Sequence, residues 1–109
     1  MPCDLLIDFH SYSRNQPYFV YVTPQTLRFG RALNLGFFAK VSQKKTIVKE
    51  RLSVFARRNG KIAITVEFVG HQENIEEEVC DGVLGVFNLM RFLKMIPGKV
   101  KRGKKQYLL

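Results

Sequence analysis

The stretch at residues 48–68 reads V-K-E-R-L-S-V-F-A-R-R-N-G-K-I-A-I-T-V-E-F, and most of its even positions are apolar. The same alternation occupies the odd positions of residues 27–41, L-R-F-G-R-A-L-N-L-G-F-F-A-K-V, where only Arg31 interrupts it. Successive side chains of a strand point to opposite faces of a sheet, so a period of two indicates strands with one apolar face. Both stretches are therefore predicted to form part of an antiparallel sheet.

The dipeptide Asn59-Gly60 divides the first stretch into two strands and is a strong hairpin signal. A two-residue turn would set apolar positions opposite polar ones, whereas a three-residue loop at residues 58–60 makes the two faces agree. The predicted register pairs Ala56 with Ile62, Val54 with Ile64 and Leu52 with Val66 on the inner face, and Arg51 with Glu67 and Phe55 with Ala63 on the outer face.

Residues 24–41 carry a competing signal, because Thr23-Pro24 is typical of the start of a helix. A helix over this range would scatter the apolar residues around its axis, whereas a strand gathers them on one face. Gly30 and Gly36 also suit a bent strand better than the interior of a helix. We therefore expect a long bent strand here, with further strands at residues 3–9 and 18–23.

After Gly70 the apolar period lengthens to about 3.6 residues, which predicts a helix. Asn74 can cap it, acidic residues occupy its first turn, and Pro97 ends it. The side expected to pack on the sheet consists of Ile75, Val79, Val83, Val86, Met90 and Leu93.

The predicted fold class is α+β. We expect an antiparallel, meander-like and strongly bent sheet of four to six strands, with a barrel-like curl as an alternative, and one long C-terminal helix packed on its apolar face. Residues 1–96 are expected to form a single domain. Residues 97–109 form a basic C-terminal tail, read either as a short strand or as a mobile arm.

The charge of the chain favours anionic partners. Its 109 residues include 18 Lys and Arg against 9 Asp and Glu, which gives a net charge of +9. Five of the nine acids fall within residues 73–81, so the rest of the molecule is strongly basic. Such a surface attracts polyanions through long-range electrostatics and counterion release.

The face of the predicted sheet that is turned away from the core combines cations with aromatic rings, which suits a phosphate chain with bases that stack. We therefore expect a protein that binds RNA or single-stranded DNA with low sequence specificity. The expected nucleic-acid-binding residues on this face are Arg28, Phe38, Lys40, Arg51, Phe55, Arg57, Arg58 and Lys61. Those expected in the tail are Lys99, Lys101, Arg102, Lys104 and Lys105.

The sequence gives weaker support to other classes. His10 and Asp8 would point to the same side of a strand, with Ser11 and Ser13 nearby, but no nucleophile elbow accompanies them, so no enzyme is expected. A small ribonuclease that uses His10 is the less favoured alternative. A non-catalytic oligomeric interaction or regulatory protein with an acidic partner is the main one.

The expected compartment, cofactors and assembly of the protein follow mainly from signals that its sequence lacks. Cys3 and Cys80 show no metal-ligand or disulfide spacing, so we expect reduced thiols, no metal and no cofactor. We see neither a secretion signal nor a membrane span, so a cytoplasmic protein without a membrane partner is expected. A homodimer is expected because a sheet with one helix leaves strand edges to cover.

Overall fold

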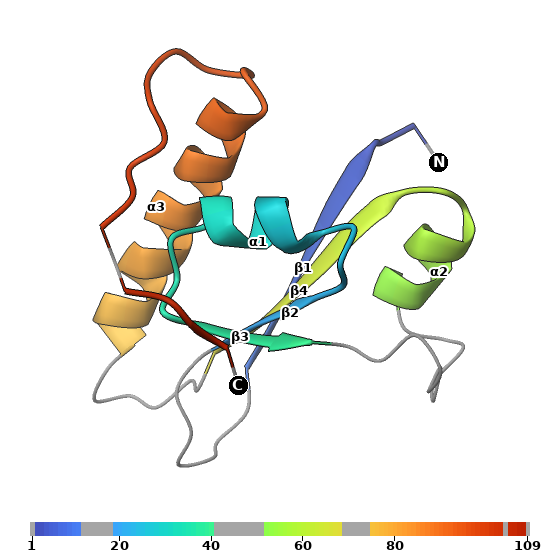
Figure 1. Cartoon of the computed structure of the whole chain (residues 1–109), viewed down its shortest axis with the longest axis horizontal. Coiled ribbons are helices and arrows are strands. Elements are labelled where there is room, and N and C mark those ends of the chain that lie inside the picture. The colour runs from blue at the N-terminus through green and yellow to red at the C-terminus, as the bar shows by residue number, and fades with distance from the viewer. Residues whose placement is uncertain (1, 12–18, 41–51, 69–74, 104, 109) are drawn as a thin grey trace.

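The computed structural model describes residues 2–11, 19–40, 52–68, 75–103 and 105–108 (Figure 1). Within them the order of elements is β1 (Leu5–Ser11), β2 (Phe19–Val22), α1 (Leu27–Ala32), β3 (Phe37–Lys40), α2 (Leu52–Arg58), β4 (Ile62–Phe68), α3 (Ile75–Phe92) and β5 (Tyr107–Leu108).

The five strands form one mixed sheet in the order β1-β4-β2-β3-β5. The pairs β1–β4, β2–β3 and β3–β5 are parallel, and only β2 and β4 run antiparallel. The predicted antiparallel meander with one covering helix is therefore wrong. Parallel neighbours cannot be joined by tight hairpins, and the connections here pass through helices.

The predicted long strand at residues 27–41 is in fact α1 followed by β3. The rejected helix signal is correct only in part, since α1 is limited to six residues and begins after Thr26, not after Thr23. The Thr26 Oγ1 accepts a hydrogen bond from the Thr23 backbone nitrogen at 2.8 Å in the turn before α1. Phe29, Ala32 and Leu33 are buried at helical spacing. Asn34 ends the helix with a left-handed φ of 55°.

The predicted hairpin at residues 52–68 is also wrong, because residues 52–58 form α2 and β4 pairs with β1 and β2 instead. The Asn59-Gly60 signal serves as a helix end. The Gly60 nitrogen donates to the Arg57 oxygen, and the Lys61 nitrogen donates to the Ala56 oxygen, both at 3.0 Å. With Gly60 at φ 74°, this is a Schellman motif.

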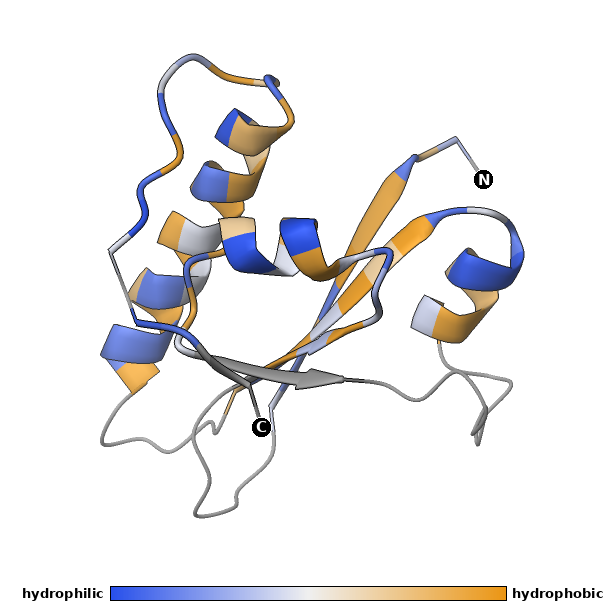
Figure 2. Cartoon of the chain, in the orientation of Figure 1, coloured by the Kyte–Doolittle hydropathy of each residue, from blue (hydrophilic) through white to orange (hydrophobic). Residues whose placement is uncertain are grey.

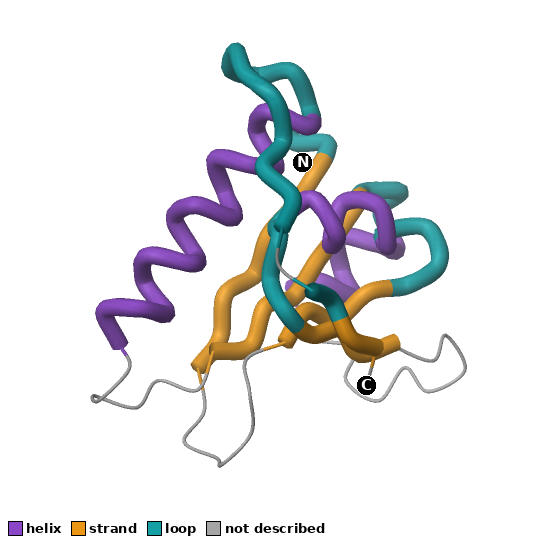
Figure 3. The backbone as a smooth tube through the Cα atoms, turned by 60° about the vertical axis from the view of Figure 1, so that its left-hand side comes forward, coloured by secondary structure: helices purple, strands orange, loops and turns teal. Residues whose placement is uncertain are grey.

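Helices cover both faces of the sheet (Figures 1 and 3). Ile64 and Val66 of β4 are fully buried in a cluster with residues of α1 and α3, including Phe29 and Leu89. Ala63 is also buried but points the opposite way and lies outside this cluster, as do Val54 and Ala56 of α2. We conclude that α2 covers the other face, so β4 is covered on both sides along most of its length and is largely hydrophobic (Figure 2).

The predicted helix is present as α3, but it packs with a different side. The buried residues are Glu78, Gly85, Asn88 and Leu89, whereas Ile75, Val79 and Val83, which were expected to face the sheet, are about half exposed. Gly85 allows the close approach, since a Cβ at that position would lie 3.0 Å from the Leu33 carbonyl oxygen. None of the described helices is both long enough and apolar enough to cross a membrane.

Candidate catalytic site

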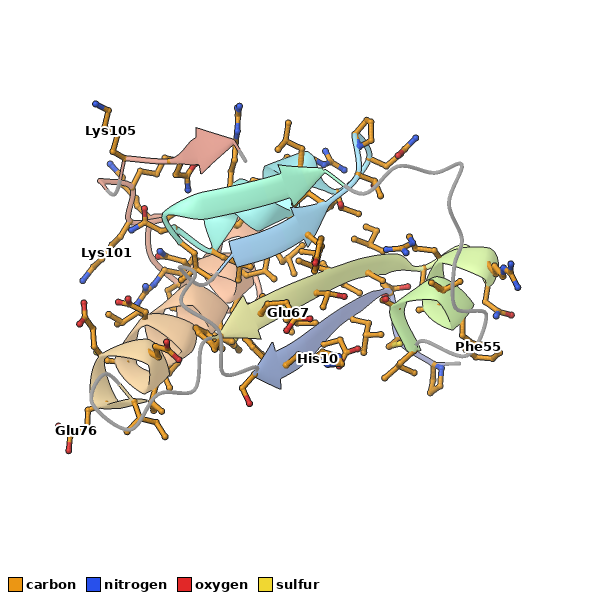
Figure 4. The ribbon with its side chains drawn as sticks, turned by 90° about the horizontal axis from the view of Figure 1, so that it is seen from below. His10, Phe55, Glu67, Glu76, Lys101 and Lys105 are labelled. Carbon is orange, nitrogen blue, oxygen red and sulfur yellow. The ribbon has the colours of Figure 1, made fainter. Side chains whose placement is uncertain are left out.

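Two strands place His10 and Glu67 side by side near the carboxyl ends of a parallel pair. β1 and β4 pair so that His10 is directly opposite Glu67, and Asp8 is opposite Thr65. Residues opposite each other on parallel strands point to the same face, and alternate residues of one strand do so as well. The side chains of His10, Glu67 and Asp8 therefore share one face of the sheet. Figure 4 shows His10 and Glu67 on their neighbouring strands.

The ring of His10 is held by Asp8. The His10 Nε2 lies 2.8 Å from the Asp8 Oδ2, and about half of the His10 side chain is exposed, against 22% for Asp8. An Nε2–H that donates to a carboxylate fixes the ring and leaves Nδ1 as the atom for proton transfer or ligation. The alternation of residues 8 and 10 suggested this shared face, and the structure adds the direct contact.

The surroundings of the three side chains are partly closed. Thr65, between Asp8 and the neighbouring strand β2, is buried, and Tyr21 of β2 is opposite it. Glu67 is intermediate in exposure. A carboxylate and an oriented imidazole are thus neighbours on one face at an accessible strand end, which is the position where parallel sheets commonly place reactive groups.

A metal ion would find too few ligands in the described residues. A histidine oriented by a carboxylate is typical of metal sites, and Glu67 is a second donor. Catalytic zinc takes three protein ligands, however, and the described part of the chain contains no cluster of three or more histidine, cysteine or acidic side chains suited to a metal. The described residues therefore do not complete a metal centre by themselves.

The residues expected to bind nucleic acid do not share one sheet face, because two of the segments that carry them are helical. Arg28 lies on α1, Phe55, Arg57 and Arg58 lie on α2, and Lys61 lies just before β4. Phe55 is 52% exposed. Burial lowers the pKa of Arg57.

The tail residues form a separate group. Lys99, Lys101, Arg102 and Lys105 are exposed, and Lys101 and Lys105 lie at the opposite end of the molecule from Phe55 (Figure 4). Phe38 and Lys40 belong to β3, but their side chains lie outside the described part, as do Arg51 and Lys104 entirely.

An apolar groove of about 620 Å³ lies on the other face of β1 and β4, against α3. β1 is one of the two edge strands of the described sheet. Phe9 stacks on Phe68 with ring centroids 5.9 Å apart, and Val79, Val83 and Phe87 of α3 line the groove while about half exposed. A monomeric protein rarely exposes such a large apolar surface beside an unpaired strand edge.

Comparisons with known proteins support the fold. No family model matches the sequence, and no curated protein matches it significantly. Among solved structures, the ectoine utilization protein EutE (DoeB) from Ruegeria pomeroyi is similar in its apo form, with a TM-score of 0.74 and 14% identity over 94% of this chain. Its product-bound form gives a TM-score of 0.73 with 14% identity over 97% of this chain, and this chain covers 35% of each form.

A succinylglutamate desuccinylase/aspartoacylase from Rhodobacter sphaeroides is similar with a TM-score of 0.71 and 16% identity over 96% of this chain and 34% of its own. The chain thus spans about a third of the length of these structures. At this identity the likeness establishes a shared fold only.

Proposed function

We propose that this chain carries part of the catalytic centre of a hydrolase that removes acyl groups from amino-acid derivatives, with His10 and Glu67 as the reacting side chains. The observation that carries the proposal is the His10–Glu67 pair on parallel strands, with the His10 ring fixed by Asp8. The chemistry named by the desuccinylase/aspartoacylase of similar fold supports the choice of reaction.

Glu67 would act as the general base. Its carboxylate takes a proton from a water molecule, whose oxygen forms a bond with the carbonyl carbon of the scissile amide. The carbon–nitrogen bond then breaks, and the proton held by Glu67 passes to the leaving nitrogen, so that one water is consumed for each acid and amine released. His10, oriented by Asp8, would hydrogen-bond the carbonyl or the attacking water through Nδ1.

The groups present in the described residues make up only part of such a centre, so we expect slow hydrolysis. The test is to incubate the chain with N-succinylglutamate or N-acetylaspartate and to follow the released amine by NMR. Removing one general acid or base typically costs about 10²–10⁴-fold in rate, so Glu67→Gln and His10→Ala should reduce the rate to that of buffer.

Glu76→Gln is the matched control, because it removes one exposed carboxylate at the start of α3, far from His10 (Figure 4). It should retain the wild-type rate. Absence of hydrolysis in the wild-type chain, or equal rates in wild type and Glu67→Gln, would contradict the proposal.

Binding of single-stranded nucleic acid is the second candidate, favoured by the exposed ring of Phe55 beside Arg58 and by the exposed cations of the tail. A labelled single-stranded RNA titrated by fluorescence anisotropy over a salt series tests it. Affinity should fall steeply with salt, and Phe55→Ala should weaken binding to single strands more than to duplex, since each stacked base contributes about 1–3 kcal/mol.

A further inference from the structure

Three arginines from two distant segments meet around one concavity. It measures about 570 Å³ and is lined by Arg28 and Arg31 of α1, by Arg102 of the tail, and by Pro24, Gln25, Leu27 and Phe92. α1 belongs to the core cluster of Ile64 and Val66, which point away from the face that carries His10. This Arg28–Arg31–Arg102 pocket is therefore separate from the candidate catalytic site.

Hydrogen bonds anchor the tail to the rest of the molecule and thereby hold Arg102 at the pocket. Asn88, only 3% exposed, donates from Nδ2 to the Lys101 carbonyl oxygen and accepts at Oδ1 from the Lys101 backbone nitrogen, both at 3.0 Å. Further along, the Gln106 Nε2 donates to the Arg31 carbonyl oxygen at 3.1 Å. Hydrogen bonds on both sides of Arg102 thus join the tail to α3 and to α1.

The pocket also has a fixed apolar wall. Phe92 meets the buried ring of Phe29 edge to face, with ring centroids 5.7 Å apart. The guanidinium carbon of Arg28 lies 4.7 Å from the centre of the same Phe29 ring, so this arginine is held against the surface. The lining combines cations with an aromatic ring.

In the part of the chain that the structure describes, no carboxylate balances the charge of this pocket. Its lining contains neither Asp nor Glu, and the structure places no acidic side chain of the described residues in an ion pair with these three arginines. Three guanidinium groups around one concavity repel one another unless water or an anion lies between them. An anion with several oxygens would satisfy them best, because a guanidinium presents paired donors that match phosphate.

We propose that the Arg28–Arg31–Arg102 pocket binds the phosphate group of a small phosphate ester. The volume lies within the range of about 300–1,000 Å³ that is typical of small-molecule sites, and Leu27 and Phe92 offer apolar contact to the rest of such a ligand. The net charge of +9 would raise the local concentration of the anion. This site does not depend on the proposed hydrolase function.

Titration calorimetry of the 109-residue chain with ATP and with inorganic pyrophosphate tests the proposal, with a single-stranded DNA oligonucleotide as a third probe. The triple variant Arg28→Gln, Arg31→Gln and Arg102→Gln should weaken binding of ATP and pyrophosphate by at least about tenfold, because charge-assisted hydrogen bonds are lost. The matched control Arg58→Gln, Lys99→Gln and Lys101→Gln removes the same charge from exposed positions outside the pocket and should change binding by less than about threefold.

Because the three arginines are exposed, the variant should fold, which circular dichroism verifies, and the single change Arg102→Gln gives an independent check. Equal losses in the two triple variants would show a diffuse charge effect and overturn the proposal. Lack of binding to ATP and pyrophosphate would also overturn it, even if the oligonucleotide bound, since the ligand would then be a nucleic-acid backbone.

Discussion

Gly85 of α3 packs so closely against the Leu33 carbonyl oxygen that a Cβ at position 85 would lie 3.0 Å from that oxygen. The contact joins α3 to the end of α1. Alanine has a helix propensity about 1 kcal/mol better than that of glycine, but overpacking against backbone costs about 1–3 kcal/mol. We predict that Gly85→Ala lowers the free energy of unfolding by up to about 2 kcal/mol, as measured by urea denaturation.

Gly82→Ala is the matched control one turn earlier on α3. A Cβ there would lie 3.1 Å from the ring of Phe68, which is a side chain and can shift. Its cost should be smaller than that of Gly85→Ala. The close packing of α3 on α1 would be refuted by a larger loss at position 82 than at position 85.

Gly60 ends α2 with φ 74°, a conformation that side chains with a Cβ rarely adopt. A left-handed backbone costs about 1–2 kcal/mol for such residues, so Gly60→Ala should lower the midpoint of thermal unfolding by several degrees. Gly103→Ala is the control, because Gly103 has no left-handed φ and no atom within 4 Å of its ideal Cβ. Similar shifts for the two variants would argue against the Schellman motif at this helix end.

The turn at residues 59–60 shows why the sequence misled the fold prediction. Asn-Gly favours a left-handed backbone, and that requirement is shared by hairpin turns and helix ends. In α1, the residues at positions 29, 32 and 33 give a helical face, while positions 29, 33 and 35 maintain the alternation of a strand. Short helices of six or seven residues hold too few turns for the pattern to separate the two periods.

Only one part of the candidate site, the pair of His10 and Asp8, could be predicted from the sequence. His10 and Asp8 are two residues apart, so a local strand prediction places them on one face, as the 2.8 Å contact requires. Glu67 joins them only through the parallel register of β1 with β4, more than fifty residues away in the chain. A predicted hairpin that paired Glu67 with Arg51 concealed this relationship, because it assigned the carboxylate a local partner.

The apolar groove should bind a hydrophobic dye. We predict that Val83→Ser together with Phe87→Ser reduces the fluorescence of added anilinonaphthalene sulfonate severalfold without loss of helix by circular dichroism, since both side chains are about half exposed. Leu84→Ser is the control, because Leu84 is equally exposed but does not line the groove. A comparable decrease in dye fluorescence in Leu84→Ser would mean that the dye binds exposed apolar residues in general and not the groove.

Asn88 anchors the tail through two hydrogen bonds to the Lys101 backbone. Asn88→Ala removes both side-chain hydrogen bonds to the Lys101 backbone, so we expect a loss of about 2–3 kcal/mol in the free energy of unfolding. Trypsin should cleave after Lys101 and Arg102 faster than in wild type, because the freed segment can enter the protease.

Gln106→Ala, which removes one exposed hydrogen bond to Arg31, should have a smaller effect on both measurements. Since Arg102 reaches its pocket only through this anchored segment, Asn88→Ala should also weaken pyrophosphate binding while leaving all three arginines in place. Unchanged tryptic cleavage in Asn88→Ala would show that other contacts, such as the packing of Val100 on the core, suffice to hold the tail.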